Sequence, residues 1–366
     1  MFSLYLAPFV IAAIIAGGLT FWVRTLAQRF NIVDKPNERK IHQTPIPRLG
    51  GVAIVGAFLL LVIGYGLVTP RFNFVSSHIF LFDKNLFGVI LGVLVLAVVG
   101  IIDDAKGLSA WNKLAWQVLA AVLVVAFGIG IEYIRLPGGL HWDLDTWVIP
   151  FSLLGQSFNF VVWSDLVTIF WIVLMINTVN FLDGLDGLAG GISFIAAITL
   201  FFLSFSLGQP AAALLGVIFA GSILGFLPWN FNPAKIFMGD SGSMFLGFIL
   251  GVLSVISGAK LATAFLVLGI PLLDVIWVII RRILTGKSPF RADKLHLHHR
   301  LLDAGFSQKQ TAIILYLGAA VFGIIALFSD TQDKVRAVIW LGVLMLILAA
   351  ALVILTWRKK LKSKNS

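Results

Sequence analysis

The sequence contains no cysteine and few charged residues. Without Cys among its 366 residues, disulfide bonds and thiolate metal sites are excluded. Charged residues make up 12% of the chain and hydrophobic residues 59%. A soluble globular domain has roughly 25% charged and 45–50% apolar residues. With a mean hydropathy of +1.00, the composition excludes an ordinary soluble domain and indicates an integral membrane protein.

The hydrophobic residues form long runs with the length of membrane-spanning helices. A helix needs about 20 apolar residues to cross the hydrocarbon core, whereas β-barrel strands are shorter and alternate. We therefore expect an all-α polytopic membrane protein. Eleven transmembrane helices are predicted near residues 3–23, 49–69, 86–102, 114–131, 165–179, 188–207, 211–228, 243–258, 261–281, 311–328 and 336–357. Residues 132–164, rich in Trp, Phe and Pro, could hold an interfacial or re-entrant piece that changes this number.

The basic residues are divided unevenly between the two sides of the membrane. If the loop 24–48 is cytosolic, most of the 27 Lys and Arg residues fall on that side. The positive-inside rule then predicts an N-terminus outside and a C-terminus in the cytosol. The first apolar run has no basic residue before it, unlike a secretory signal, so we expect it to be retained.

The uneven distribution of basic residues also explains the net charge of +10. Basic cytosolic loops face the anionic inner leaflet, and the basic tail 358–366 would bind lipid head groups or stop transfer. The charge therefore gives no reason to expect a nucleic-acid partner. We predict one integral-membrane domain over residues 1–357, followed by this cytosolic tail.

The conspicuous polar segments all fall on the predicted cytosolic side. A transporter would more often carry polar groups near the bilayer midplane, within its spans. Clustering at one face instead favours a site built at the membrane surface. The predicted loops of this site are 24–48, 103–113, 180–187, 229–242 and 282–310.

The segment NTVNFLDGLDGLAGG, residues 177–191, follows an apolar run. Asn180 and Asp183 are three residues apart, so they would be neighbours on a continuing helix. Amide and carboxylate oxygens are hard ligands that suit Mg²⁺, which typically takes one or two carboxylates plus substrate phosphates. The alternative is a polar turn in which the aspartates cap helices.

Five further residues carry charge or an aromatic ring beside apolar runs. Asp103 and Asp104 are adjacent carboxylates, which repel each other in a partly dry setting unless a cation or a proton relay uses them. Lys113, near the lipid boundary, could hold an anionic head group. Asp240 stands between glycines ahead of a span and could instead be a helix cap. From its position alone, Phe237 is an ordinary interfacial aromatic.

The segment HLHHR, residues 296–300, concentrates three of the six histidines. Such side chains beside carboxylates can hydrogen-bond phosphate and sugar oxygens. A transition-metal site is the alternative, although no thiolate is available. Taken together, the polar segments favour Mg²⁺-assisted phosphoryl transfer between a soluble anionic donor and a membrane-held anionic acceptor.

These motifs resemble a known family in order and content. From Asp34 to about Phe306, the chain is similar to the polyprenyl-phosphate N-acetylhexosamine-1-phosphate transferases of glycosyltransferase family 4. Those enzymes move a sugar-1-phosphate from a UDP-sugar to a lipid phosphate and release UMP. The resemblance implies a multi-pass enzyme of the bacterial inner (cytoplasmic) membrane, with its active site on the cytosolic face and Mg²⁺ as its cofactor, Mn²⁺ remaining open.

The resemblance also implies roles for the acids and for the lysine. Asp103 and Asp104 match the pair that acts on the lipid phosphate, as base or as nucleophile. Lys113 matches the lysine that holds this phosphate. Asp183 matches a catalytic position close to the metal and the pyrophosphate.

Metal and donor positions follow by the same resemblance. Asn180 and Asp240 match the metal ligands of the family. Asp186 and Phe237 match positions that recognise uridine, the phenyl ring by stacking. The histidine loop that reads the amino sugar corresponds to His296, His298, His299 and Arg300.

The HLHH pattern is similar to the loop of family members that use UDP-GlcNAc, and undecaprenyl phosphate is the implied acceptor. The product would start a teichoic acid, O-antigen or capsule pathway. Another UDP-N-acetylamino sugar or UDP-MurNAc-pentapeptide stays open as donor, as does a homodimer. A transporter or flippase of an anionic lipid-linked sugar is the alternative of another class. Asp274, inside a predicted span, has no predicted role beyond supporting the structure or the site.

Overall fold

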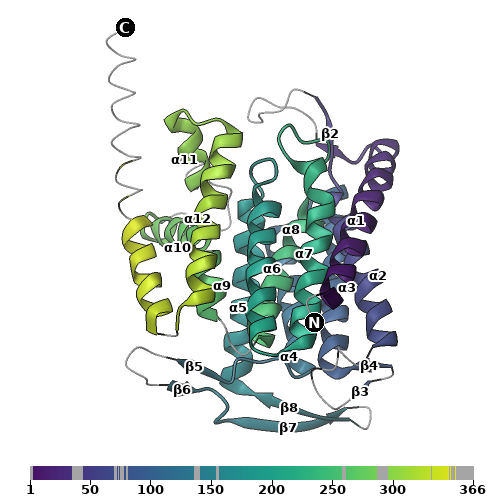
Figure 1. Ribbon diagram of the computed structural model, residues 1–366, viewed down its shortest axis with the longest axis vertical. Coiled ribbons are helices and arrows are strands. Elements are labelled where there is room, and N and C mark those ends of the chain that lie inside the picture. Colours follow the sequence, from purple (N-terminus) through teal and green to yellow (C-terminus); the bar gives the residue numbers. More distant parts are fainter. Residues whose placement is uncertain are drawn as a thin grey trace.

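The computed structural model is mainly helical and describes most of the chain (Figure 1). The described residues are 3–34, 44–69, 72, 74, 78–79, 81–135, 141–153, 156–257, 261–286, 296–330, 332–345, 347 and 351. Parts of the predicted loops 24–48 and 282–310 lie outside these residues, as does the whole predicted tail 358–366.

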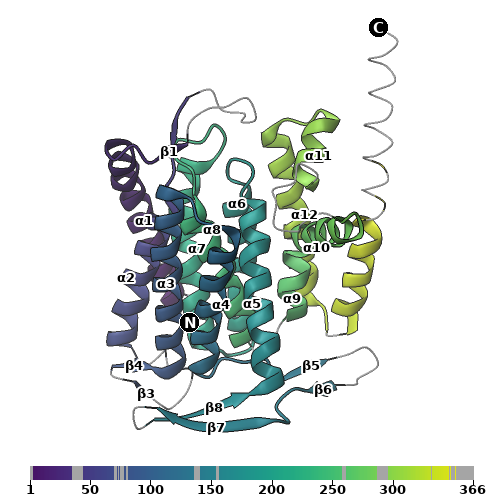
Figure 2. The same ribbon diagram turned by 180° about the vertical axis from the view of Figure 1, so that it is seen from behind.

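Twelve helices are delimited in the described residues. They are α1 (Ser3–Arg29), α2 (Gly50–Val68), α3 (Lys84–Lys106), α4 (Ala110–Ala126), α5 (Val162–Leu182), α6 (Leu188–Ser206), α7 (Pro210–Asn230), α8 (Asp240–Ile256), α9 (Leu261–Val267), α10 (Gly269–Leu284), α11 (Leu297–Ala304) and α12 (Gln308–Phe328). A further helical run covers 332–345. The long helices stand side by side in a bundle (Figure 2).

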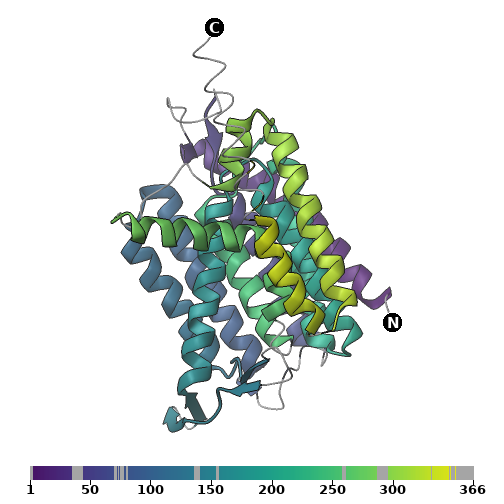
Figure 3. The same cartoon turned by 90° about the vertical axis from the view of Figure 1, so that its left-hand side faces the viewer.

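Seven of the described helices are long and apolar enough to cross a membrane, or eight if α9 and α10 form one broken span. These two helices meet at an angle of 85°. Figure 3 shows α10 lying across the long helices. The chain is therefore a polytopic membrane protein. The predicted number of eleven spans stays a prediction, because α4 and α8 are shorter apolar helices and the last predicted span is described only in part.

Short antiparallel hairpins depart from the all-α expectation. The strand pairs are β1 (Val33–Asp34) with β2 (Ile46–Pro47), β3 (His78–Ile79) with β4 (Phe82–Asp83), β5 (Tyr133–Arg135) with β6 (His141–Asp143), and β7 (Val148–Leu153) with β8 (Gln156–Val161). The segment 132–164 thus contains β-hairpins, which suit its β-branched and aromatic residues. In Figure 1, β3 to β8 lie at one end of the bundle, and β2 lies at the other.

Helix α8 is the buried centre of the bundle, and its packing brings the polar loops together. Every residue from Ser241 to Val255 is buried, as expected for a helix that is largely apolar on all sides. Glycines allow close approach to its neighbours. A Cβ added to Gly247 would lie 2.5 Å from Ile176 Cα of α5, and one added to Gly100 of α3 would lie 2.3 Å from Ser241 Cα.

The close contact of α5 with α8 predicts a stability effect at Gly247. Replacing Gly247 by Ala places a methyl group against the α5 backbone and should lower stability by about 1–3 kcal/mol. The matched control is Gly64→Ala in α2, where an added Cβ has no atom within 4 Å. Thermal unfolding in detergent or nanodiscs should show a lower Tm for Gly247→Ala only. Equal Tm values for the two variants would contradict this packing.

Candidate active site

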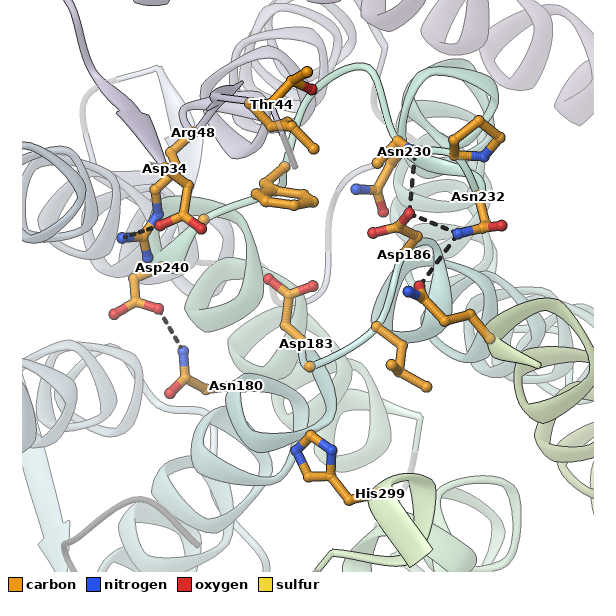
Figure 4. Close-up of a pocket in the computed structure, with 18 residues that line it drawn as sticks. Asp34, Thr44, Arg48, Asn180, Asp183, Asp186, Asn230, Asn232, Asp240 and His299 are labelled. Carbon is orange, nitrogen blue, oxygen red and sulfur yellow. Dashed lines mark hydrogen bonds and ion pairs between the residues drawn. The ribbon is translucent and has the colours of Figure 1, made fainter. Parts of the chain in front are cut away.

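A cavity of about 720 Å³ opens at the end of the bundle where β1 and β2 lie. Its walls come from the region of β1 and β2, the turn between α5 and α6, the segment between α7 and α8, and the start of α11 and α12. Figure 4 shows the polar residues that face it. Four of the five predicted polar loops therefore contribute directly to one cavity.

Asp240 lies in the first turn of α8. It lines the cavity and also contacts polar residues that do not line it. Its Oδ2 accepts a hydrogen bond from Lys113 Nζ at 2.8 Å, and its Oδ1 accepts one from Asn180 Nδ2 at 3.0 Å. Lys113 also donates to Asp103 Oδ2 at 3.0 Å. Asp240 and Asn180 line the cavity, whereas Lys113 and Asp103 do not. The carboxylate of Asp240 thus forms the boundary between two groups of polar residues.

Asp104 accepts hydrogen bonds from the beginning of α8. Its carboxylate binds Asp240 N at 2.8 Å, Ser241 N at 3.2 Å and Ser241 Oγ at 2.8 Å. The N-cap residue Gly239 has no side chain that could accept these bonds. Asp104 therefore caps α8 from α3, with a side chain that is 0% exposed and does not line the cavity. Its predicted action on the lipid phosphate stays a prediction.

Asp183 lies directly after α5 and faces the cavity between the Asp240–Asn180 pair and Asp186 (Figure 4). Burial, reinforced by the negative charges of Asp240 and Asp104, raises the pKa of Asp183 to about 7. The positive charge of Arg48 opposes part of this rise. The arrangement therefore concentrates negative charge that a bound cation would offset.

The donor set suits a hard divalent cation, although it is not a complete protein cage. Within the described residues, no group of three or more His, Cys, Asp or Glu side chains has metal-binding geometry. Mg²⁺ requires fewer protein ligands, because water and substrate phosphates complete its octahedral shell. Asp183, Asp240 and Asn180 supply carboxylate and amide oxygens along one wall of the cavity. These residues fit such an ion.

Asp186 is held on the opposite side by the segment that follows α7. Its Oδ2 accepts from Asn232 Nδ2 at 2.9 Å and from Ala234 N at 3.0 Å. Phe237, also predicted to contact the nucleotide, lines the same cavity. Its amide N–H donates to Pro47 O at 2.8 Å, which ties the segment before α8 to β2.

Only part of the predicted histidine loop lines the cavity. His299 lines the cavity. His296 and His298 are buried beside Asp274, and Arg300 does not line the cavity. Burial, aided by the neighbouring His299 and His296, lowers the pKa of His298 to about 3, so this imidazole is neutral at physiological pH.

Several cavity residues carry no role in the sequence-based prediction. Arg48 lies 3.8 Å from Asp34 and 3.8 Å from Asp104, measured between guanidinium nitrogens and carboxylate oxygens. Its motif, PIPRLGG, was a usable signal because it belongs to a predicted site loop. Asn232 and Gln308 also lie in predicted site loops, 229–242 and 282–310, but neither carries a charge that marks it within its loop. They meet only in the folded chain, where Asn232 Nδ2 donates to Gln308 Oε1 at 3.2 Å.

Capping by Asp104 predicts a stability effect that is separate from catalysis. Asp104→Ala leaves three donors of α8 without their acceptor and should cost about 1–3 kcal/mol of folding stability. Asp186→Ala, which removes an acceptor from a loop rather than from the central helix, is the comparison. We expect the larger fall in Tm for Asp104→Ala. A Tm equal to that of the unaltered protein would contradict the capping role.

Comparisons with known proteins found one matching family and several similar proteins. Residues 86–258 match the family described as "Glycosyl transferase family 4". The chain is 32% identical, over 92% of its length and 87% of the relative's, to a probable undecaprenyl-phosphate N-acetylglucosaminyl 1-phosphate transferase of Bacillus subtilis. It is 36% identical to a decaprenyl-phosphate N-acetylglucosaminephosphotransferase of Mycolicibacterium smegmatis, over 85% and 79% of the two chains.

A third similar protein comes from Escherichia coli. It is an undecaprenyl-phosphate alpha-N-acetylglucosaminyl 1-phosphate transferase, 28% identical over 90% of this chain and 84% of its own. Each of these three alignments spans most of the chain.

Proposed function

The chain belongs to glycosyl transferase family 4, as its motifs predicted, and on this premise we propose that it transfers N-acetylglucosamine-1-phosphate from UDP-GlcNAc to undecaprenyl phosphate. The products are a lipid-linked GlcNAc pyrophosphate and UMP. The observation that carries the proposal is the position of Asp240. This carboxylate lines the large polar cavity and is hydrogen-bonded to Lys113, which lies behind it with Asp103.

In this proposal the cavity takes the soluble donor. Phe237 and Asp186 bind the uracil, and Asp186 is already fixed by Asn232 and by the Ala234 amide. Arg48 lies on the same wall as Asp240 and offers a guanidinium to the donor's diphosphate. His299 is the residue of the histidine loop that faces the donor. His296, His298 and Arg300 support that loop without lining the cavity.

The lipid phosphate reaches the site from the side of Lys113 and Asp103. The ammonium of Lys113 offsets its charge, as expected for a lysine near the lipid boundary. An oxygen of the lipid phosphate forms a bond to the β-phosphorus of the donor, and the bond from that phosphorus to the oxygen shared with the α-phosphorus breaks. UMP leaves with this electron pair. Asp103 acts as a base on the lipid phosphate in this direct route. In the alternative route Asp103 is the nucleophile: it attacks the β-phosphorus, UMP leaves, and the lipid phosphate then displaces the Asp103 carboxylate from that phosphorus.

Mg²⁺ is the cofactor of the proposal, held by Asp240 and Asn180 with Asp183 beside it. When bound, the ion offsets charge on the diphosphate and stabilises the negative charge that develops on the leaving group. Lys113 and Asn180 keep the Asp240 carboxylate in one orientation. Burial and, after it, the negative charges of Asp240 and Asp104 raise the pKa of Asp183 at this position.

We further propose a bacterial inner membrane location with the cavity on the cytosolic face. The support is the positive-inside pattern together with the position of the cavity at the end of the bundle that carries β1 and β2. A nucleotide-sugar donor made in the cytosol would enter there directly. The proposed donor site is formed by residues of one chain, so it does not require a homodimer.

The proposal predicts UMP release that depends on donor, lipid and Asp240. Purified protein with Mg²⁺ and undecaprenyl phosphate is offered UDP-GlcNAc, UDP-GalNAc or UDP-MurNAc-pentapeptide in parallel. We expect UMP from UDP-GlcNAc, and a loss of about 100-fold or more in Asp240→Asn, the size that removal of one preorganised electrostatic group causes.

The matched control for this assay is Asp165→Asn, a buried carboxylate at the start of α5, far from the cavity along the helix. It should retain activity. UMP from a different donor would change the proposed sugar and keep the reaction. No UMP from any donor by folded, lipid-supplied protein would refute the proposed transfer.

Metal removal gives an independent prediction. Chelation with EDTA should abolish UMP release, and added Mg²⁺ or Mn²⁺ should restore it, because both ions accept oxygen ligands in octahedral geometry. Asp183→Asn should raise the Mg²⁺ concentration needed for half-maximal rate, since it removes a negative charge beside the ion. Full activity in EDTA would exclude the metal from the proposal.

A further inference from the structure

Asp274 has no part in the proposed transfer, yet it is the acid of a short polar chain that ends at the cavity. It belongs to α10, the helix that bends by 85° from α9. Its side chain is only 13% exposed. A carboxylate in this position is costly unless its oxygens are hydrogen-bonded, so its partners indicate what it does.

Both oxygens of Asp274 accept hydrogen bonds from the start of α11. The distance from Oδ2 to His296 Nδ1 is 2.8 Å, and Leu297 N donates to Oδ1 at 3.0 Å. An ionised carboxylate can only accept, so Nδ1 of His296 carries the proton in this pair. His296 is the N-cap residue of α11, and its own side chain makes no capping bond. Asp274 therefore caps α11 from a different helix.

The histidines continue from this anchor to the cavity. The His296 ring stacks on Phe181 at 5.6 Å and lies 5.8 Å from His298, with only 3° between the two imidazole planes. The His298 ring is 4.3 Å from that of His299, which lines the cavity. These contacts link Asp274 to the face of His299 that the donor would meet.

The packing around His298 leaves little freedom for this chain of contacts. A Cβ added to Gly184 would lie 2.6 Å from His298 Nε2. Gly184 directly follows Asp183, so the histidines rest against the same turn that carries the acidic residues. A shift at the start of α11 would therefore displace His299 relative to Asp183 and the donor.

We propose that Asp274 is a positioning residue, which fixes the His296 tautomer and the first turn of α11 so that His299 faces the sugar phosphate of the donor. The inference rests on the proposed function and adds to it how the histidine loop is held. It assigns Asp274 an effect on the affinity for the UDP-sugar. UMP, which lacks the sugar and its phosphate, should bind independently of Asp274.

Asp274→Asn tests the inference with little change in volume. The His296 and Leu297 contacts use different oxygens of Asp274, and an amide places an NH₂ donor where one of these oxygens was, so one of the two contacts is lost. Loss of one charge-assisted hydrogen bond corresponds to about 10- to 100-fold in an equilibrium constant. We expect the Kd for UDP-GlcNAc, measured by calorimetry in Mg²⁺ buffer, to rise about 10-fold or more, while the Kd for UMP changes less than about twofold.

Two comparisons separate positioning from a general loss of stability. Asp165→Asn alters another buried carboxylate, which accepts the Val161 N–H at 2.8 Å, and should leave both Kd values unchanged. In a double-mutant cycle, Asp274→Asn should add little to His299→Ala, because both changes act on the same donor contact. A merely structural role would give a lower Tm, similar changes for both ligands and additive effects.

The outcomes distinguish this inference from the proposed function. If the unaltered protein binds UDP-GlcNAc and Asp274→Asn binds it equally well, the inference is wrong and the proposed function stands. If the unaltered protein does not bind UDP-GlcNAc, both are wrong. If Asp274→Asn does not fold, His296→Ala is the second variant, because it removes the hydrogen bond between His296 and Asp274 by changing the histidine. The same selective loss of donor affinity would support the inference, and unchanged affinity would overturn it.

Discussion

The first turn of α8 is the constraint on which the site depends. Asp104 of α3 caps this turn, Lys113 of α4 and Asn180 of α5 hydrogen-bond Asp240, and α8 itself is buried along its length. Helices from distant parts of the sequence thus meet at one carboxylate. Close glycine contacts bring α3 and α5 near enough for these hydrogen bonds. The geometry of the site therefore depends directly on how these helices pack.

The same turn separates two environments that a transferase between water and membrane requires. On one side is an open polar cavity with Asp183, Asp186 and His299, suited to a large anionic nucleotide. On the other side Lys113 and Asp103 form an ion pair at the end of two apolar helices, suited to a lipid phosphate. Asp240 contacts both sides. This division suits a transfer to a polyprenyl phosphate, the reaction that the names of the similar proteins describe.

The sequence predicted the helices and the convergence of their polar ends, because apolar length and side-chain type report these features locally. It did not predict what depends on packing between distant segments. The capping role of Asp104 arises from α8 lying against α3. His299 lines the cavity, whereas His296 and His298, within three residues of it in the sequence, are buried. This difference follows from how the start of α11 is anchored at Asp274. The bend between α9 and α10 was also missed by the prediction of one continuous span, although Pro271 was a local signal for it, because its nitrogen cannot donate to the Val267 carbonyl four residues earlier.

The central claim is that the bond broken lies between the two phosphates of the donor, at a site that joins both substrates. The most direct test follows the phosphorus atoms of UDP-GlcNAc labelled with ³²P in either the α or the β position, in the presence of undecaprenyl phosphate. We predict that the β label enters the lipid fraction and that the α label leaves as UMP. If both labels remained in released UDP while the sugar entered the lipid, the protein would transfer the sugar alone, and the proposed transfer of a sugar-1-phosphate would be wrong.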